Sequence, residues 1–306
     1  MPLLRRKRVL AAKIETTPGT AISLAAADAD YNVFNAIIQP SVETEGREGQ
    51  SAFSALASVP GPRMGTCTFS TELTAGGTVP EWAATFLPAC GFVDTAGVFS
   101  PVTEAPGSNV KTLTIAVYND GIVKKLVGCS GTFVIRLSAG RKSMIDFTFT
   151  GKWADPDDVA ILAPTYPTTA PLRFASATST IGGTAYRLSE VSIDAGNQVV
   201  MLESDADATG FHYALITGRN VTGTLSPELT LVATKDWHNE WLTRVEQALS
   251  IALAGSSQTL TIAAPKLQFT NLQETSTNDV TREAITFQCN RSASAGNDEL
   301  TLTFAA

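Results

Sequence analysis

Apolar and polar residues alternate along most of the chain, and this pattern predicts β-strands. Leu113, Ile115 and Val117 alternate with smaller or polar residues, most often Thr. The same period of two runs through residues 132–138, 145–150, 260–262, 285–287 and 300–304. Such a period places apolar side chains on one face of a sheet and polar side chains on the other. Because no helix alternates with these strands, we expect antiparallel sheets.

One helix in each half interrupts the strand pattern. Asp236 is a residue type that caps helices, and apolar residues follow it at intervals of four, which predicts a helix with one apolar stripe made of Trp237, Trp241, Val245 and Leu249. The first half carries a shorter counterpart that begins at Pro80 and contains the pair Trp82 and Phe86. Each helix is expected to pack against a sheet.

The chain contains an internal repeat. Six of the ten residues from Gly65 to Thr74 recur 156 positions later, between Val221 and Thr230. We also match Glu81-Trp82 with Glu240-Trp241, the sequence TLTIA at 112–116 with TLTIA at 259–263, and the closing strand 145–149 with 300–304. A repeat of about 150 residues has the size of a domain.

The repeat predicts a mainly β chain of two tandem domains. Each is expected to be a β-sandwich or barrel with one flanking helix, and the boundaries are an N-terminal arm at 1–30, domain 1 at 31–153, a linker at 154–185 and domain 2 at 186–306.

Each half also has a long segment without a strand pattern before its recurring strand, at 45–62 and 195–218. Loops of this length are usually functional or become ordered against a partner. Candidate contact residues are Arg47, Glu48, Gln50 and Phe53 in the first loop, and Asp205, Asp207, Phe211 and His212 in the second.

Composition and charge narrow the function classes. The chain has 306 residues, 44% of them hydrophobic, and a formal charge of −7. This negative charge argues against electrostatic binding of nucleic acid. No apolar window approaches the roughly 20 residues of a membrane-spanning helix. The basic run Arg5–Arg8 precedes an apolar stretch too short for a signal peptide. It could contact nucleic acid or an acidic partner surface, but a solvated tail is the simpler interpretation.

Candidate chemistry is sparse. His212 and His238 lie near no motif that would make either one a catalytic base. The acidic run Glu203–Asp207 lacks the Gly and terminal Glu of an EF-hand, so we interpret it as a solvated loop. Four cysteines lack metal-ligand spacing and are predicted to be buried free thiols: Cys67, Cys90, Cys129 and Cys289. We expect no enzymatic activity, no cofactor and no metal.

Two strands joined by a turn resemble the tail tube proteins of long-tailed bacteriophages of the non-contractile type. The first reads GCSGTFVIRLSAGR at 128–141 and the second IDFTFTG at 145–151; AKIETTPGT at 12–20 and REAITF at 282–287 are also similar to that family. The resemblance implies a structural virion protein of the phage tail that is assembled in the host cytoplasm. Its subunits would stack as rings around a channel through which DNA passes without specific binding. It also implies partners: further copies of the chain, the tape measure protein, the tail terminator and distal tail proteins.

Rings in this family commonly contain six single domains. Three chains of two domains each would therefore close one ring with pseudo-sixfold symmetry. In the recurring strand the polar face is identical in both copies while the alternate face differs, which favours one shared environment for the polar face. We expect this face to line the lumen through Thr66, Thr68, Ser70, Glu72, Thr222, Thr224, Ser226 and Glu228.

In that arrangement Glu72 and Glu228 would form an acidic ring that repels phosphates, and the two long loops would contact the next ring. Two alternatives remain open at this point. The polar face is also what a solvated sheet surface would look like. The chain as a whole could instead be a duplicated β-sandwich that serves as a binding or adhesion module of a virion or cell surface.

Overall fold

The chain is mainly β, as its sequence predicts. The computed structural model describes residues 4, 6–50, 53–76, 79–255, 258–277 and 279–305. The strands of the first half are β1 (Arg8–Ile14), β2 (Val33–Glu48), β3 (Ala55–Glu72), β4 (Phe92–Thr95), β5 (Val98–Pro101), β6 (Leu113–Asn119), β7 (Ile122–Ser138) and β8 (Met144–Asp158). Those of the second half are β9 (Thr178–Ile181), β10 (Thr184–Ala185), β11 (Leu188–Asp194), β12 (Asn197–Glu203), β13 (Phe211–Arg219), β14 (Thr222–Pro227), β15 (Glu246–Ala254), β16 (Thr259–Thr277), β17 (Val280–Cys289) and β18 (Thr301–Ala305). The helical elements are α1 (Glu81–Ala89), α2 (Trp237–Leu242) and a 3-10 turn (Ala26–Ala29).

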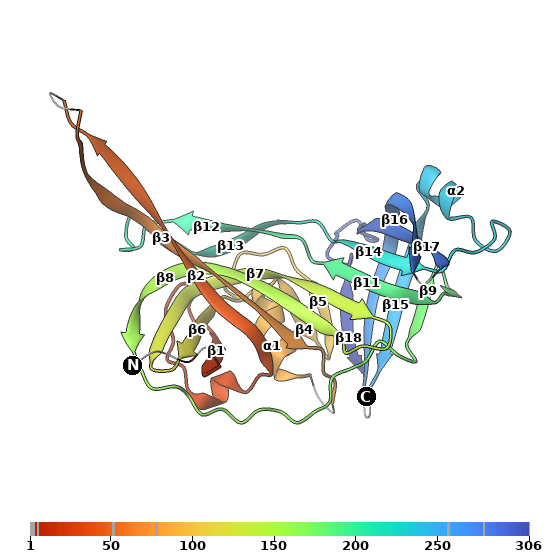
Figure 1. Ribbon diagram of the computed structural model, residues 1–306, viewed down its shortest axis with the longest axis horizontal. Helices are drawn as coiled ribbons and strands as arrows, with labels where there is room; N and C mark the ends of the chain where they lie inside the picture. The colour runs from red at the N-terminus through yellow and green to blue at the C-terminus, as the bar shows by residue number, and fades with distance from the viewer. Residues whose placement is uncertain are drawn as a thin grey trace.

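One antiparallel sheet runs through both halves of the molecule (Figure 1). Its central strands follow the order β2-β3-β8-β7 in the first half and continue as β11-β14-β17-β16 in the second. In the first half, β6 joins the edge of β7 and β1 joins β6. In the second half, β15 joins β16 and β9 joins β15. The two halves therefore share one pairing scheme, in which β3 corresponds to β14, β8 to β17, β7 to β16, β6 to β15 and β1 to β9.

Strand pairing corrects two of the sequence matches. The first TLTIA segment, at 112–116, leads into β6, whereas the second, at 259–263, opens β16, which takes the place of β7. The closing strand β18 pairs with the start of β16, so it takes the place of the far end of β8 and not of residues 145–149. Short stretches in which Thr alternates with apolar residues are common in half-buried strands of any kind. Sequence identity over five residues was therefore not enough to identify equivalent strands.

The helix of the second half is shorter than predicted. Asp236 does cap it, since its carboxylate accepts a hydrogen bond from the Asn239 N–H, but α2 ends at Leu242. Val245 lies beyond the helix, and Leu249 belongs to β15, where Leu249, Ile251 and Leu253 point to the same buried face. In the first half, α1 packs as expected, with Phe86 buried against Phe69, Phe147 and Phe149.

The segments expected to be arm and linker also contain strands. Residues 8–14 of the N-terminal arm form β1. At the two ends of the expected linker, residues 154–158 complete β8, and residues 178–181 and 184–185 form β9 and β10. One hydrophobic cluster includes residues of both halves, among them Phe147 and Phe287. The two halves thus pack as one body.

Both long loops of the sequence analysis are β-hairpins. Residues 45–50 and 53–62 belong to the outer part of the β2–β3 hairpin, which projects far from the body in Figure 1. Residues 195–218 include the β12–β13 hairpin, a separate two-stranded sheet. The first was missed because both of its faces are exposed, so its residues need not alternate in polarity.

Candidate assembly surfaces

The candidate lumen residues lie on the face of the sheet that turns away from the core. Thr66, Thr68, Ser70 and Glu72 on β3 are half-buried, while the residues between them are buried. Thr222, Thr224, Ser226 and Glu228 follow the same alternation on and just beyond β14. Across the ladder, Thr68 lies opposite Thr148 and Thr224 opposite Thr286, so the polar surface extends onto β8 and β17.

Cations neutralise the acidic residues of this face. Lys142 lies 2.8 Å from the Glu72 carboxylate, and Arg282 lies 3.7 Å from that of Glu228. Asp146 pairs with Arg136 and also accepts a hydrogen bond from Ser70. Lys142 comes from the connection between β7 and β8, and Arg282 comes from β17. The face therefore carries far less negative charge than an acidic ring of Glu72 and Glu228 would.

The outer part of the β2–β3 hairpin stands free of the body. β8 pairs with β3 only from Met64 onward, and Arg63 still bonds to Thr209 and Asp155, so beyond Arg63 the ladder joins only β2 and β3. Arg47, Glu48, Gln50 and Phe53 lie toward its outer end and are exposed. Val42, Leu56 and Val59 are exposed along its length. An isolated two-stranded hairpin is marginally stable in water, so a partner surface is expected.

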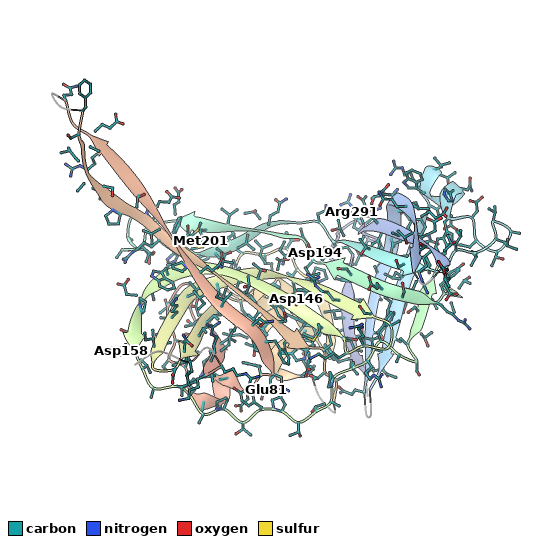
Figure 2. The ribbon with its side chains drawn as sticks, viewed as in Figure 1. Glu81, Asp146, Asp158, Asp194, Met201 and Arg291 are labelled. Carbon is teal, nitrogen blue, oxygen red and sulfur yellow. The ribbon has the colours of Figure 1, made fainter. Side chains whose placement is uncertain are left out.

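The β12–β13 hairpin is docked on its own chain. Phe211 packs with Met201, Ala214 and Met64, and Met201 lies where the hairpin crosses the base of β3 (Figure 2). Lys152 of β8 lies 2.9 Å from the Asp207 carboxylate, and this hydrogen bond holds the pKa of Asp207 below its ordinary value. His212 contacts the same carboxylate at 3.0 Å. Of the four residues selected here, Asp207 and Phe211 hold the hairpin in place, while Asp205 and His212 remain exposed.

Arg219 anchors this hairpin to the first half. Its guanidinium lies 3.0 Å from the Glu299 carboxylate and donates to the carbonyl oxygens of Val102 and Gly91. Asn197, at the start of the hairpin, donates to the carbonyl oxygens of Cys90 and Gly131. Buried, charge-assisted bonds of this kind fix the orientation of two packed elements.

The central strand order from β2 to β16 has an open edge at each end. In the described part of the chain, β2 pairs with β3 alone. At the other end, β15 covers β16 only as far as Gln268, so the remainder of that strand is unpaired on the same side. Between these ends, β7 and β11 join the two halves through five ladder pairs, from Val134 opposite Asp194 to Ser138 opposite Glu190.

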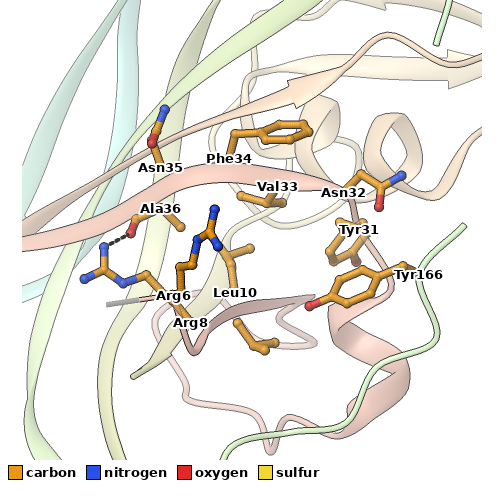
Figure 3. Close-up of a pocket in the computed structure, with 11 residues that line it drawn as sticks. Arg6, Arg8, Leu10, Tyr31, Asn32, Val33, Phe34, Asn35, Ala36 and Tyr166 are labelled. Atoms are coloured by element: carbon orange, nitrogen blue, oxygen red, sulfur yellow. Dashed lines mark hydrogen bonds between the residues drawn. The ribbon is translucent and has the colours of Figure 1, made fainter. Parts of the chain in front are cut away.

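The open edge of β2 carries a basic groove of about 670 Å³ (Figure 3). Arg6 and Arg8 line one side, and residues 33–36 of β2 line the other. The Arg8 guanidinium donates to the Ala36 carbonyl oxygen at 2.6 Å, while its Nε is buried without a partner among the described residues. From the sequence alone, a solvated tail is the favoured interpretation of this basic run, and a contact with nucleic acid or an acidic partner surface is the alternative.

The open end of β16 is acidic. Glu274 is exposed, and Glu283, opposite it in the ladder, is only 2% exposed, with a carboxylate oxygen that no described group contacts. A buried carboxylate without a partner is costly, so a cation is expected to reach it. Neither residue was singled out from the sequence, because their role depends on which strand edge is open.

The cysteines match the prediction. All four are buried and none is bonded to another. Burial raises the pKa of Cys67 and of Cys289 to about 12. None of the helices in the described part of the chain is long and apolar enough to cross a membrane.

The chain matches a known protein family. A family model described as phage tail tube protein matches residues 5–305, nearly the whole chain. No curated protein matches the chain in a sequence search.

Proposed function

The chain belongs to the phage tail tube protein family, and we propose that three copies of it close a ring through the open edges of β2 and β16. Its role in the virion tail is structural. The observation that supports the ring is the junction of β7 with β11, where the chain already joins two sheet units of the same pairing order edge to edge. Repeating that junction between chains would pair the open edge of β2 with the open edge of β16.

The register of the junction between chains follows from the junction within the chain. Cys67 pairs with Ile38, and Gly223, 156 positions later, pairs with Ile193, so Ile38 corresponds to Ile193. Phe147 pairs with Phe69 and Ile285 pairs with Leu225, which makes these two pairs equivalent.

Two residues before Phe147 and Ile285, Ile145 pairs with Ile135 and Glu283 pairs with Glu274. Glu274 therefore corresponds to Ile135. Because Ile193 lies opposite Ile135 within the chain, Ile38 of one chain would lie opposite Glu274 of its neighbour.

Charge supports this register. Ala36, which accepts a hydrogen bond from Arg8, lies two residues from Ile38 on β2. The basic groove of one chain would thus receive the acidic end of the β16–β17 hairpin of the next, and Arg8 would meet Glu274 and Glu283. Each side supplies a buried atom without a hydrogen-bond partner among the described residues, Arg8 Nε on one side and a Glu283 carboxylate oxygen on the other, so pairing would offset part of the desolvation cost of both.

The polar face of the sheet would line the lumen in such a ring. It is built mostly from uncharged Thr and Ser, and its carboxylates are paired with cations. DNA would pass along a wet, nearly neutral surface that offers no cluster of Lys and Arg for phosphates to bind. The projecting β2–β3 hairpin would reach the neighbouring ring, where a second surface can bury Val42, Leu56 and Val59.

Electron microscopy of the purified chain tests the ring. We expect annular particles or tubes in which one turn contains three chains and shows six similar lobes. Particles with six chains in each ring, or monomers at concentrations where tail tubes are formed in infected cells, would contradict the proposal. Mass measurement of the smallest closed particle gives the number of chains independently.

A further inference from the structure

We propose that the N-terminal segment of one chain, residues 2–7, covers an exposed apolar site around Leu229 on the second half of the neighbouring chain. This inference rests on the proposed ring and adds a contact that strand pairing alone does not supply. It is carried by a contact that the chain makes with itself at the equivalent place in its first half.

In the first half, the segment before β9 covers the end of β3. Leu172 is 3% exposed and Leu73 is fully buried. The Leu172 N–H donates to the Leu73 carbonyl oxygen at 2.7 Å, and the Ser143 N–H donates to the Leu172 carbonyl oxygen at 2.8 Å. The segment thus inserts between two strand ends as it passes from one half to the other.

In the second half, the equivalent site is uncovered. Leu229 lies 156 positions after Leu73, and its N–H donates to the Thr281 carbonyl oxygen just as that of Leu73 donates to Ser143. Leu229 is nevertheless 40% exposed, Leu231 80% and Val280 46%. The same backbone frame therefore exists twice, but only the first copy has its apolar cover.

Strand register identifies the missing cover. The β6–β7 ladder has a bulge just before Ile115, and the β15–β16 ladder has a bulge just before Leu249. We therefore treat Ile115 and Leu249 as equivalent positions of β6 and β15. Two residues later, Val117 pairs with Leu10 and Ile251 pairs with Ser179, which places Leu10 and Ser179 at equivalent positions, 169 apart.

The same offset of 169 carries Pro171-Leu172 onto Pro2-Leu3. The Pro-Leu dipeptide thus recurs at the offset that the strand pairing gives, and the strand pairing does not involve either dipeptide. Residues 2 and 3 lie outside the described part of the chain. Since β1 of a chain begins its first half, the segment before it faces the second half of the preceding chain in the ring.

Two further observations fit this occupant. Leu172 Cδ2 lies close to the β15–β16 turn, where a Cβ added to Gly255 would be 2.9 Å away. The N-terminal segment lies beside the corresponding β6–β7 turn, since the Leu4 N–H donates to Asp120 at 3.0 Å and Lys7 pairs with the same carboxylate. The segment is also basic, whereas the hairpin end that it would pass carries Glu274 and Asp279.

A disulfide trap tests the contact directly. In the double variant Leu3→Cys with Leu229→Cys, mild oxidation of assembled tubes should link successive chains into covalent oligomers on a non-reducing gel. The four native cysteines are buried and leave the background low. The matched control combines Leu3→Cys with Leu202→Cys, because Leu202 is also 40% exposed but lies on β12. It should give no ladder.

A second pair of variants measures the energetic effect. Leu3→Asp should raise the protein concentration needed for assembly roughly ten- to a hundredfold, the value expected when one buried Leu is lost at each junction. Leu4→Asp should change it little, because Leu4 corresponds to the exposed Arg173.

Tubes that form normally but give no specific cross-link, or equal effects of Leu3→Asp and Leu4→Asp, would overturn the inference and leave the ring intact. Failure of the unmodified chain to form rings of three would instead overturn the proposed function together with this contact.

Discussion

Proline at position 274 should block ring closure while leaving the isolated chain folded. Within the chain, the Ala195 N–H donates to the Phe133 carbonyl oxygen across the β7–β11 junction. Main-chain groups alternate in direction along a strand, so those of Ile193 and Ile135 also point across this junction. By the equivalence derived above, the Glu274 N–H points to the open edge of β16. An edge strand tolerates proline where the lost N–H faces solvent.

The cost appears on assembly. Once a neighbouring β2 covers this edge, Glu274→Pro leaves the opposed Ile38 carbonyl oxygen buried without its donor, which costs about 1–3 kcal/mol at each junction. Over the three junctions of a ring this amounts to about 3–9 kcal/mol, and each 1.4 kcal/mol is about tenfold in an equilibrium constant.

Sedimentation against protein concentration measures the loss of assembly, and thermal unfolding of the monomer confirms that the fold persists. Glu274→Ala separates the loss of the carboxylate from the loss of the N–H and should weaken assembly less. Glu274→Pro tubes that form at the same concentration as the unmodified tubes would refute the edge-pairing argument.

Three more outcomes follow from the contacts described above. Replacing residues 43–62 by a two-residue Asn-Gly turn should give a folded chain that closes rings but does not stack them, because Val42 and Arg63 face each other in the ladder; stacked tubes of this variant in electron micrographs would exclude the hairpin from stacking. Arg219→Ala should lower the free energy of unfolding by about 3–5 kcal/mol in urea titrations, since Glu299 loses its buried partner; a loss below about 1 kcal/mol would show that the anchor is dispensable. Asp207→Asn should be less stable than the unmodified chain at neutral pH and equally stable at low pH. A lowered carboxyl pKa stabilises the fold at pH values above the ordinary pKa of the carboxyl group, and this stabilisation is lost as the pH falls through the folded-state pKa. A difference in melting temperature that does not change with pH would contradict this.

The sequence predicted those parts of the fold in which one face of an element is buried. Alternation around Leu113 and Phe147 marks real strands because their apolar side chains pack into the core. Apolar spacing also made the predicted helix α2 too long. The spacing of Trp237, Trp241, Val245 and Leu249 fits a helix, but Leu249 is a buried residue of strand β15. The alternation rule failed for the β2–β3 hairpin, which has no buried face at its outer end.

The assembly surfaces depended on long-range pairing that composition does not reveal. Glu72 and Glu228 looked like free acids because their partners, Lys142 and Arg282, are distant in sequence. Arg8 and Glu283 acquire meaning only once the sheet order shows which edges are open. By contrast, the recurring strand at 66–74 and 222–230 could be aligned from sequence, since both copies keep the same place in the sheet.

A cryo-electron microscopy reconstruction of the assembled tube tests the central claim most directly. We predict three chains in each ring, with β16 of one chain paired to β2 of the next so that Glu274 lies opposite Ile38 and the junction superimposes on that of β7 with β11. A ring in which the edges of β2 and β16 remain unpaired, or in which six chains close the circle, would contradict the account.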